Sequence, residues 1–352
     1  MRKLHPLLPL LFFLVCFLFM LGVMPKVSAE TYTADFLTFG TGARPLGMGN
    51  AFTAIADEAS TTYYNPAGIA QLTHHEFNFM HATLADLASY NVASYIYPFK
   101  YSKQSKKMTF GISWLRVGVD DIPITGIPVT TKAIGPNNRP YVIGTFSNTS
   151  NAILLSGAAH LITLPQNITI DVGTSLKLLY IDTYRNTNAV GGGTDLGILA
   201  KTNPNKAAAF SFGIVGSDFL TTKLYWNTPP ASEYGEGEGE SPHTETLLPR
   251  LKLGIAYHQK LAVFNSRFTL AADVDTRNDY EFHTGAEYVL FELLALRCGL
   301  DGRNGTSRAM YFTAGAGLQL RFVTGAAFHV DYAYQSQPDL GISNRLSLRV
   351  KF

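Results

Sequence analysis

The stretch ITIDVGTSLKLLY, residues 168–180, alternates apolar and polar side chains with a period of two. Such alternation predicts a β-strand with one apolar and one polar face. The stretch is also long enough to cross a bilayer at a tilt, which takes about 9–11 residues, whereas strands of soluble proteins average about 5–6. The apolar face carries Ile168, Ile170, Val172, Leu176, Leu178 and Tyr180, and the other face carries Thr169, Asp171, Gly173, Ser175 and Lys177.

The same alternation recurs along the chain and predicts about 14 strands, the even number expected of a bacterial barrel. Short connections at 103–106, 165–166, 203–205, 262–264 and 323 alternate with long segments at 119–149, 183–192, 218–248, 302–308 and 336–342. We therefore expect an all-β fold, a transmembrane antiparallel β-barrel over residues 75–352. A soluble sandwich, whose strands also alternate, is the alternative. The predicted strands are 75–86, 88–99, 107–118, 150–163, 167–182, 193–202, 206–217, 249–260, 265–275, 280–290, 292–301, 309–321, 324–335 and 343–352.

The composition agrees with a membrane barrel. Only 15% of the residues are charged, and the chain holds 31 Gly, 18 Tyr and 23 Phe. Soluble proteins carry about 25% charged residues, whereas a barrel has an apolar outer band flanked by aromatic girdles. The formal net charge of +2 gives no basic surface for nucleic acid, so no nucleic-acid partner is expected.

Residues 1–29 have the three parts of an export signal. Arg2 and Lys3 precede the apolar stretch 7–23, and the small residues at 27–29 suit cleavage before Glu30. A retained helical anchor is the alternative. Export as a barrel predicts location in the cell outer membrane of a Gram-negative-type bacterium, with outer-membrane lipid and the barrel-assembly machinery as partners. Terminal Phe352 ends an alternating strand and resembles the C-terminal assembly signal of many such barrels.

A compact segment, residues 30–74, precedes the predicted barrel. Its core, GTGARPLGMGNAFTAIADEASTTYYNPAGIA at 40–70, begins with glycines that favour tight backbone paths. The small apolar run 51–59 predicts a short helix ending near Ser60. The segment is too small to fold alone, so we expect it to pack inside the barrel as a hatch or plug.

The run from Gly42 to Ala70 resembles the N-terminal signature of the FadL-like outer-membrane proteins, specifically the PorV/PorQ branch. Asn65, Pro66 and Ala67 match the box at which hatch and barrel meet in that family. The resemblance implies a 14-stranded barrel with an N-terminal hatch. FadL itself moves long-chain fatty acids, with the hatch gating a lateral opening, and the PorV branch is associated with type IX secretion in some bacteria.

Two functions follow from this resemblance. The first is an outer-membrane transporter for hydrophobic small molecules such as long-chain fatty acids, by hatch-gated diffusion. The alternative is a PorV-like component of a protein secretion system, which acts by binding secretion-system proteins through segments 119–149 and 218–248. Gly111 and Gly118 are candidates for a kink in the wall, or ordinary strand glycines. Eight apolar and aromatic residues of segment 30–74 either line a ligand pocket or only pack the plug. They are Phe36, Leu37, Phe39, Met48, Phe52, Ile55, Tyr63 and Tyr64.

The charged residues and histidines of the chain suggest no catalytic site. The lumen is expected to be polar, with charges of both signs that pair across the barrel and anchor the plug. Glu236, Glu238 and Glu240 alternate with glycine and suit either a divalent cation or a solvated acidic loop. The histidines are scattered, without a nucleophile elbow or zinc spacing, so we expect no enzyme, no metal and no cofactor.

Overall fold

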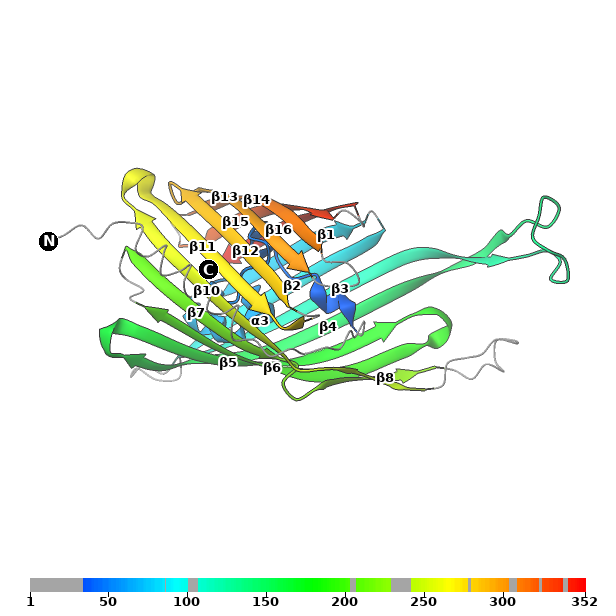
Figure 1. Cartoon of the computed structure of the whole chain (residues 1–352), viewed down its shortest axis with the longest axis horizontal. Coiled ribbons are helices and arrows are strands. Elements are labelled where there is room, and N and C mark those ends of the chain that lie inside the picture. Colours follow the sequence, from blue (N-terminus) through cyan, green and yellow to red (C-terminus); the bar gives the residue numbers. More distant parts are fainter. Residues whose placement is uncertain are drawn as a thin grey trace.

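The strands of the chain close into a barrel, with the N-terminal segment inside it (Figure 1). In this computed structural model the described residues are 34–85, 87–100, 107–202, 207–228, 242–277, 280–303, 309–322, 325–337 and 341–352. The predicted signal peptide at 1–29 and Glu236, Glu238 and Glu240 lie outside these residues.

Fourteen strands of the described chain form the wall. Each pairs antiparallel with its neighbours, and β1 pairs with β16 from Glu76 opposite Lys351 to Thr83 opposite Asn344, which closes the ring. The predicted fold class is therefore confirmed. The wall strands are β1 (Glu76–Leu84), β2 (Ala88–Lys100), β3 (Lys107–Gly126), β4 (Tyr141–Leu164), β5 (Ile168–Asp182), β6 (Asn188–Thr202), β7 (Ala208–Ser217), β10 (Arg250–Leu261), β11 (Ser266–Asp275), β12 (Glu281–Leu290), β13 (Leu294–Arg303), β14 (Ala309–Arg321), β15 (Ala327–Gln337) and β16 (Gly341–Lys351).

The alternation in sequence becomes an alternation between the outer face and the lumen. In β5, Leu176, Leu178 and Tyr180 are 45%, 46% and 46% exposed, whereas Ser175 and Lys177 are buried in the lumen. Because lipid offers no hydrogen-bond partner, the closed ring satisfies the backbone while apolar side chains face outward. Short 3-10 turns join some strands at one end of the barrel, which we call the short-turn end, and the opposite end is the long-loop end. These turns include η3 (Pro165–Asn167) and η6 (Val263–Asn265).

Two of the segments expected to be loops contain strands, so this part of the prediction is wrong. β3 continues to Gly126 and β4 already begins at Tyr141, which leaves a long two-stranded projection beyond the barrel (Figure 1). The segment 218–248 contains β8 (Thr222–Asn227) and β9 (Thr244–Leu247), which pair with each other. β8 also pairs with β6. The alternation in β8 and β9 is short and interrupted, and for this reason the segment was expected to be a loop. The 3-10 turn η4 (Tyr184–Asn186) lies between β5 and β6.

The segment inside the barrel, residues 34–72, is called the hatch below. It contains η1 (Asp35–Thr38), α2 (Ala43–Gly47), α3 (Thr61–Tyr64) and η2 (Pro66–Gln71). The helix predicted over 51–59 is wrong, because barrel side chains take the backbone N–H groups of this stretch. The N–H groups of Phe52 and Thr53 each donate to the Asp273 carboxylate at 2.8 Å, and that of Ala59 donates to Glu76 at 2.6 Å. Among the residues described, none of the helices has the length and apolar character needed to span a membrane.

Candidate functional site

Asn65 makes hydrogen bonds both within the hatch and to the barrel wall. Its side-chain amide donates to the carbonyl oxygen of Thr53 at 2.9 Å and to that of Ile198 in β6 at 3.2 Å. Its side-chain oxygen accepts from the N–H of Ala67 at 3.1 Å and caps η2, which begins at Pro66. Both N–H donors of this buried side chain and one lone pair of its oxygen are used, so a residue of another shape leaves carbonyls or an N–H unpaired. The Asn-Pro-Ala box is therefore a structural junction.

Glycines of the barrel seat the hatch backbone. A Cβ atom built on Gly213 in β7 would lie 2.2 Å from the Thr53 carbonyl oxygen, and one on Gly299 in β13 would lie 2.3 Å from the Gly49 nitrogen. Gly173 and Gly197 face each other across β5 and β6 and approach the Asn65–Ala67 turn in the same way. Only a residue without a side chain permits such close approach of two backbones. We call these residues, together with Gly254 and Gly285, the glycine belt.

Arg44 is the main charged anchor of the hatch. It is 5% exposed and donates to both carboxylate oxygens of Glu287 in β12, at 2.7 and 2.9 Å. It also donates to Asp57 at 2.6 Å and to Glu58 at 3.2 Å. Arg349 of β16 pairs with Glu58 from the other side. The expected anchoring of the plug by lumen charges is thus present, carried by bidentate, charge-assisted hydrogen bonds.

Two hatch carboxyl groups respond to this network. Burial raises the pKa of Asp57, but the Arg44 guanidinium outweighs burial and holds that pKa well below its usual range. Burial likewise raises the pKa of Glu58, and Arg349 together with Arg44 lowers it below its ordinary value. Both carboxylates are therefore charged at neutral pH and hold the hatch to the wall.

The residues expected to line a pocket separate into two groups. Met48, Phe52, Ile55 and Tyr64 lie in the core of the hatch, where they pack against small inward-facing side chains such as Ala256 of β10. The Tyr64 hydroxyl donates to Asn50 at 2.8 Å, and the Phe52 and Tyr64 rings meet edge to face at 5.4 Å. These four residues pack the plug. Phe36, Leu37 and Phe39 lie elsewhere, toward the long-loop end, and Tyr63 packs against both groups.

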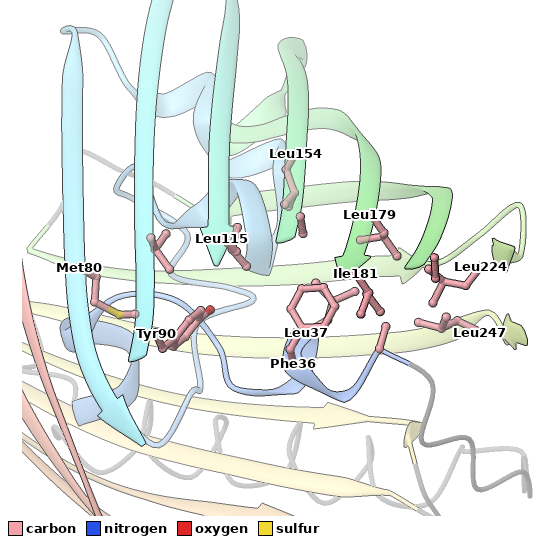
Figure 2. Packing of buried hydrophobic residues seen from close by; sticks show 14 of the residues in the cluster. Phe36, Leu37, Met80, Tyr90, Leu115, Leu154, Leu179, Ile181, Leu224 and Leu247 are labelled. Carbon is pink, nitrogen blue, oxygen red and sulfur yellow. The ribbon is translucent and has the colours of Figure 1, made fainter. Parts of the chain in front are cut away.

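This second group faces an apolar patch on the inner wall, shown in Figure 2. Phe36 and Leu37 of η1 cover the patch, and the Tyr63 hydroxyl donates to the Leu37 carbonyl. The expectation of a uniformly polar lumen is therefore wrong, because several strands carry apolar residues on both faces near the long-loop end. We call this group the outer apolar cluster; it comprises Ala34, Phe36, Leu37, Met80, Ala82, Tyr90, Val92, Leu115, Ala152, Leu154, Leu179, Ile181, Ala189, Leu224 and Leu247, with Phe39, Tyr63 and Trp226 at its edge.

The lumen beside the hatch also has a charged wall. A cavity of about 30 Å³ is lined by Tyr63 and Tyr64 on one side and by charged residues of β10–β13 on the other. Within this wall, Arg250 lies 3.2 Å from Asp275, and Lys252 lies 3.4 Å from the same carboxylate. The lumen is therefore amphipathic, with an apolar side over β1–β6, β8 and β9 and a charged side over β10–β13.

Strand β6 changes its pairing partner between β8 and β7 along its length. β7 pairs with β6 over residues 196–201, whereas β8 pairs with β6 over 188–192. The intervening residues 218–221 turn out of register, with Asp218 and Thr221 at φ 55° and 60°. Inside, Lys177 bonds to Asp218 and lies 2.8 Å from Asp195. Outside, Phe219 and Leu220 are 55% and 70% exposed.

The glycines proposed for a wall kink do not mark such a break. Gly111 pairs with Ile96 of β2 and Ser156 of β4, and the pairing is equally regular at Gly118. In β3 the irregularity comes later, between Val119 and Ile122. A Cβ on Gly111 would meet the Thr62 methyl group at 2.9 Å, so this glycine makes room for the hatch instead.

Phe352 lies at the short-turn end. Its ring stacks on His75 with centroids 5.6 Å apart, and its N–H donates to the His75 carbonyl at 3.0 Å. Because the side chain is 58% exposed, it remains available for recognition. Its role as an assembly signal stays a prediction.

Comparison with known proteins shows what this chain is similar to. The model of an uncharacterised protein family, UPF0164, matches residues 20–152. A UPF0164 protein of Treponema pallidum (strain Nichols) is 34% identical over 107 residues, which is 30% of this chain and 26% of that protein. The matched stretch thus spans about a quarter of the relative's length.

Solved structures share the fold. A Pseudomonas aeruginosa FadL homologue superposes with a TM-score of 0.50 at 11% identity, covering 89% of this chain and 98% of its own. The monoaromatic hydrocarbon channel CymD gives a TM-score of 0.50 at 12% identity, covering 89% of this chain and 96% of its own. The chain therefore has the fold of the FadL-like barrels.

Sequence reasoning missed the glycine belt and the outer apolar cluster. A signal for the belt was present, because each of its glycines falls on the polar face of its strand. The cluster had a weaker signal: Leu115, Leu154 and Leu179 interrupt the polar faces of three strands. Only the closed ring shows that these three leucines lie together in one cluster.

Proposed function

We propose that this protein is an outer-membrane channel through which hydrophobic small molecules diffuse, gated by the hatch. The outer apolar cluster carries the proposal, because apolar side chains that line a wet lumen cost free energy unless something apolar covers them. In the closed state Phe36 and Leu37 provide that cover. A hydrophobic molecule entering from the long-loop end, which we take to face outward, replaces them. The fold shared with FadL-like barrels supports the proposal. We also propose the chemical class of the cargo, namely hydrophobic molecules such as long-chain fatty acids.

The exit of the cargo is part of the proposal. The change of partner at 218–221 lies beside Leu224 of the cluster, and β6 carries Gly191, Gly192 and Gly193 opposite it. β6 passes there from one partner strand to another and its glycines add no side-chain contacts, so we expect the wall to open most readily at this point. We propose that the cargo leaves sideways into the membrane at this point, while the anchored hatch keeps the route to the short-turn end closed.

Trp226 gives a direct test, since it packs against the cluster and the chain has only two tryptophans. With Trp114→Phe as background, bromobenzene or 12-bromododecanoate, whose bromine quenches indole fluorescence, should quench Trp226 fluorescence saturably. Leu179→Asn places an amide in the cluster and should weaken the affinity about 5- to 150-fold, as expected for about 1–3 kcal/mol of polar burial. Leu178→Asn is the matched control, because the neighbouring side chain is 46% exposed on the outer face. Equal affinities in the two variants would contradict a binding site in the cluster.

A second candidate is the secretion role, in which a PorV-like protein binds other proteins. The projection of β3 and β4 favours it, because Tyr141, Val142 and Ile143 are 53%, 61% and 58% exposed there. Two-stranded ribbons are only marginally stable alone, so a partner would stabilise this one. Deletion of residues 121–145 should then remove protein partners from gently extracted complexes and leave ligand quenching of Trp226 intact. Loss of quenching without loss of partners would exclude this reading.

A further inference from the structure

A basic cavity opens at the short-turn end, on the side of the hatch away from the outer apolar cluster. It has a volume of about 150 Å³ and lies between the hatch and the ends of β6, β10 and β11. Lys201, Lys260 and Arg267 line it from the wall, and Arg44 and Asp57 line it from the hatch. A second cavity of about 90 Å³ shares Lys260 and Arg267.

Positive charge in the larger cavity exceeds negative charge. Four cationic side chains and one carboxylate among its lining residues give +3, with His258 neutral. Two of the cations are already used: Arg44 bonds to three carboxylates, and Lys201 donates to the side-chain oxygen of Gln71. Arg44 balances Asp57, so the excess falls on Lys201, Lys260 and Arg267, and of these only Lys260 and Arg267 have no hydrogen-bond acceptor among the described residues.

Several cations of the lumen have a carboxylate partner within the described structure, and these two side chains do not. Arg297 and Arg303 lie 2.7 and 2.9 Å from carboxylates. For the ammonium group of Lys260 and the guanidinium group of Arg267, by contrast, the described part of the chain offers no carboxylate within 4 Å and no hydrogen-bond acceptor. Both lie on the inward face of their strands, in phase with His258 and Thr269, so they do not serve lipid head groups on the outside.

We propose that Lys260 and Arg267 bind a small anion, a carboxylate or phosphate, at the short-turn end of the barrel. A guanidinium fork matches two oxygens of either group, and a nearby ammonium adds a mobile donor. The bound anion also relieves the repulsion between the uncompensated cations. The site lies on the opposite side of the hatch from the outer apolar cluster and does not depend on the proposed transport. The anion is either free in the compartment at that end or the head group of a short amphipathic molecule.

Isothermal titration of the folded protein in a non-ionic, phosphate-free detergent tests the site. The probes are inorganic phosphate, hexanoate and hexanol. Saturable binding of phosphate alone indicates a free anion, and binding of hexanoate without hexanol indicates an amphipathic carboxylate; either supports the site. The double variant Lys260→Gln/Arg267→Gln should weaken binding at least about tenfold, as expected for charged hydrogen bonds. Lys132→Gln, which removes one positive charge in the β3–β4 projection and so matches Lys260→Gln alone, should leave binding unchanged.

Two results would overturn the proposal: no binding of phosphate or hexanoate, or unchanged affinity in the double variant. If that variant does not fold, Lys260→Gln alone serves, because its side chain makes no bond whose loss would destabilise the barrel; a loss of severalfold is then expected. Quenching of Trp226 by bromobenzene, a neutral apolar quencher, should be the same in all of these variants. Absence of Trp226 quenching in the parent protein would contradict the proposed transport, and the proposed anion site would remain.

Discussion

Replacing Arg44 by Met should release the hatch without destroying the barrel. The change keeps the aliphatic contact with Phe52, whose ring centroid lies 5.3 Å from the guanidinium carbon, but removes the charge. Glu287 and Glu58 keep Arg297 and Arg349 as partners, whereas Asp57 loses its ion pair at 2.6 Å. Because the Asp57 side chain is 34% exposed, water replaces part of its ion pair, and the main loss is the buried, charge-assisted hydrogen bonding to Glu287, about 1.5–3 kcal/mol. The ratio of released to seated hatch should therefore rise about tenfold to about 150-fold.

Hydrogen exchange measures this ratio. The N–H groups of Phe52, Thr53 and Ala59 bond to wall carboxylates, so they exchange only when the hatch leaves its seat. Their exchange in Arg44→Met should accelerate by the factor above, while amides of the β1–β16 pair remain protected.

Arg321→Met is the control for this experiment. Its ion pair with Glu292 is 63% and 47% exposed, so its loss should cost at most about 1 kcal/mol and leave hatch exchange unchanged. If Arg44→Met exchanges at the rate of this control, the charged anchor does not hold the hatch. If the strand amides accelerate as well, the variant has unfolded the barrel and the hatch is not an independent unit.

Three further predictions concern the same seat. Gly213→Ala forces a methyl group against the Thr53 carbonyl and should destabilise the hatch by about 1–3 kcal/mol, seen as faster hatch exchange, whereas Gly157→Ala, whose Cβ meets only the Phe110 ring at 3.8 Å, should not. Equal effects would refute the glycine belt. Because Asp57 and Glu58 have lowered pKa values, their stabilisation is complete above about pH 4–5 and is lost as pH falls through their lowered values. Hatch exchange, corrected for its intrinsic pH dependence, should thus stay constant from pH 7 to about 5 and accelerate only in stronger acid; acceleration near pH 6 would contradict this. Asn65→Leu loses the bonds to two carbonyls and one N–H and should raise single-channel conductance in planar bilayers; a conductance equal to that of the parent protein would show that the junction does not close the lumen.

The sequence by itself determined the barrel. Period-two alternation over stretches such as 168–180 follows directly from the pleat of a strand, and the even count of long strands follows from closure in lipid. It also placed a hatch before the barrel, because 30–74 is too small to fold alone. Tight backbone turns were expected at the glycines of this segment, and Gly40, Gly42 and Gly49 indeed have positive φ values of 71°, 85° and 62°.

Only the tertiary structure decided how hatch and barrel meet. The absence of a helix over 51–59 depends on wall residues outside this stretch: Asp273 lies 221 residues from Phe52, and Glu76 lies 17 residues from Ala59. Local propensity contains no information about such distant acceptors, and they outweigh it here. The separation of Phe36 from Phe52 into two apolar groups likewise depends on where each strand places its inward side chains. Alternation fixes which face a residue occupies, whereas the closed ring fixes which residues from different strands lie opposite one another, and that second relation creates the hatch seat, the outer apolar cluster and the basic cavity.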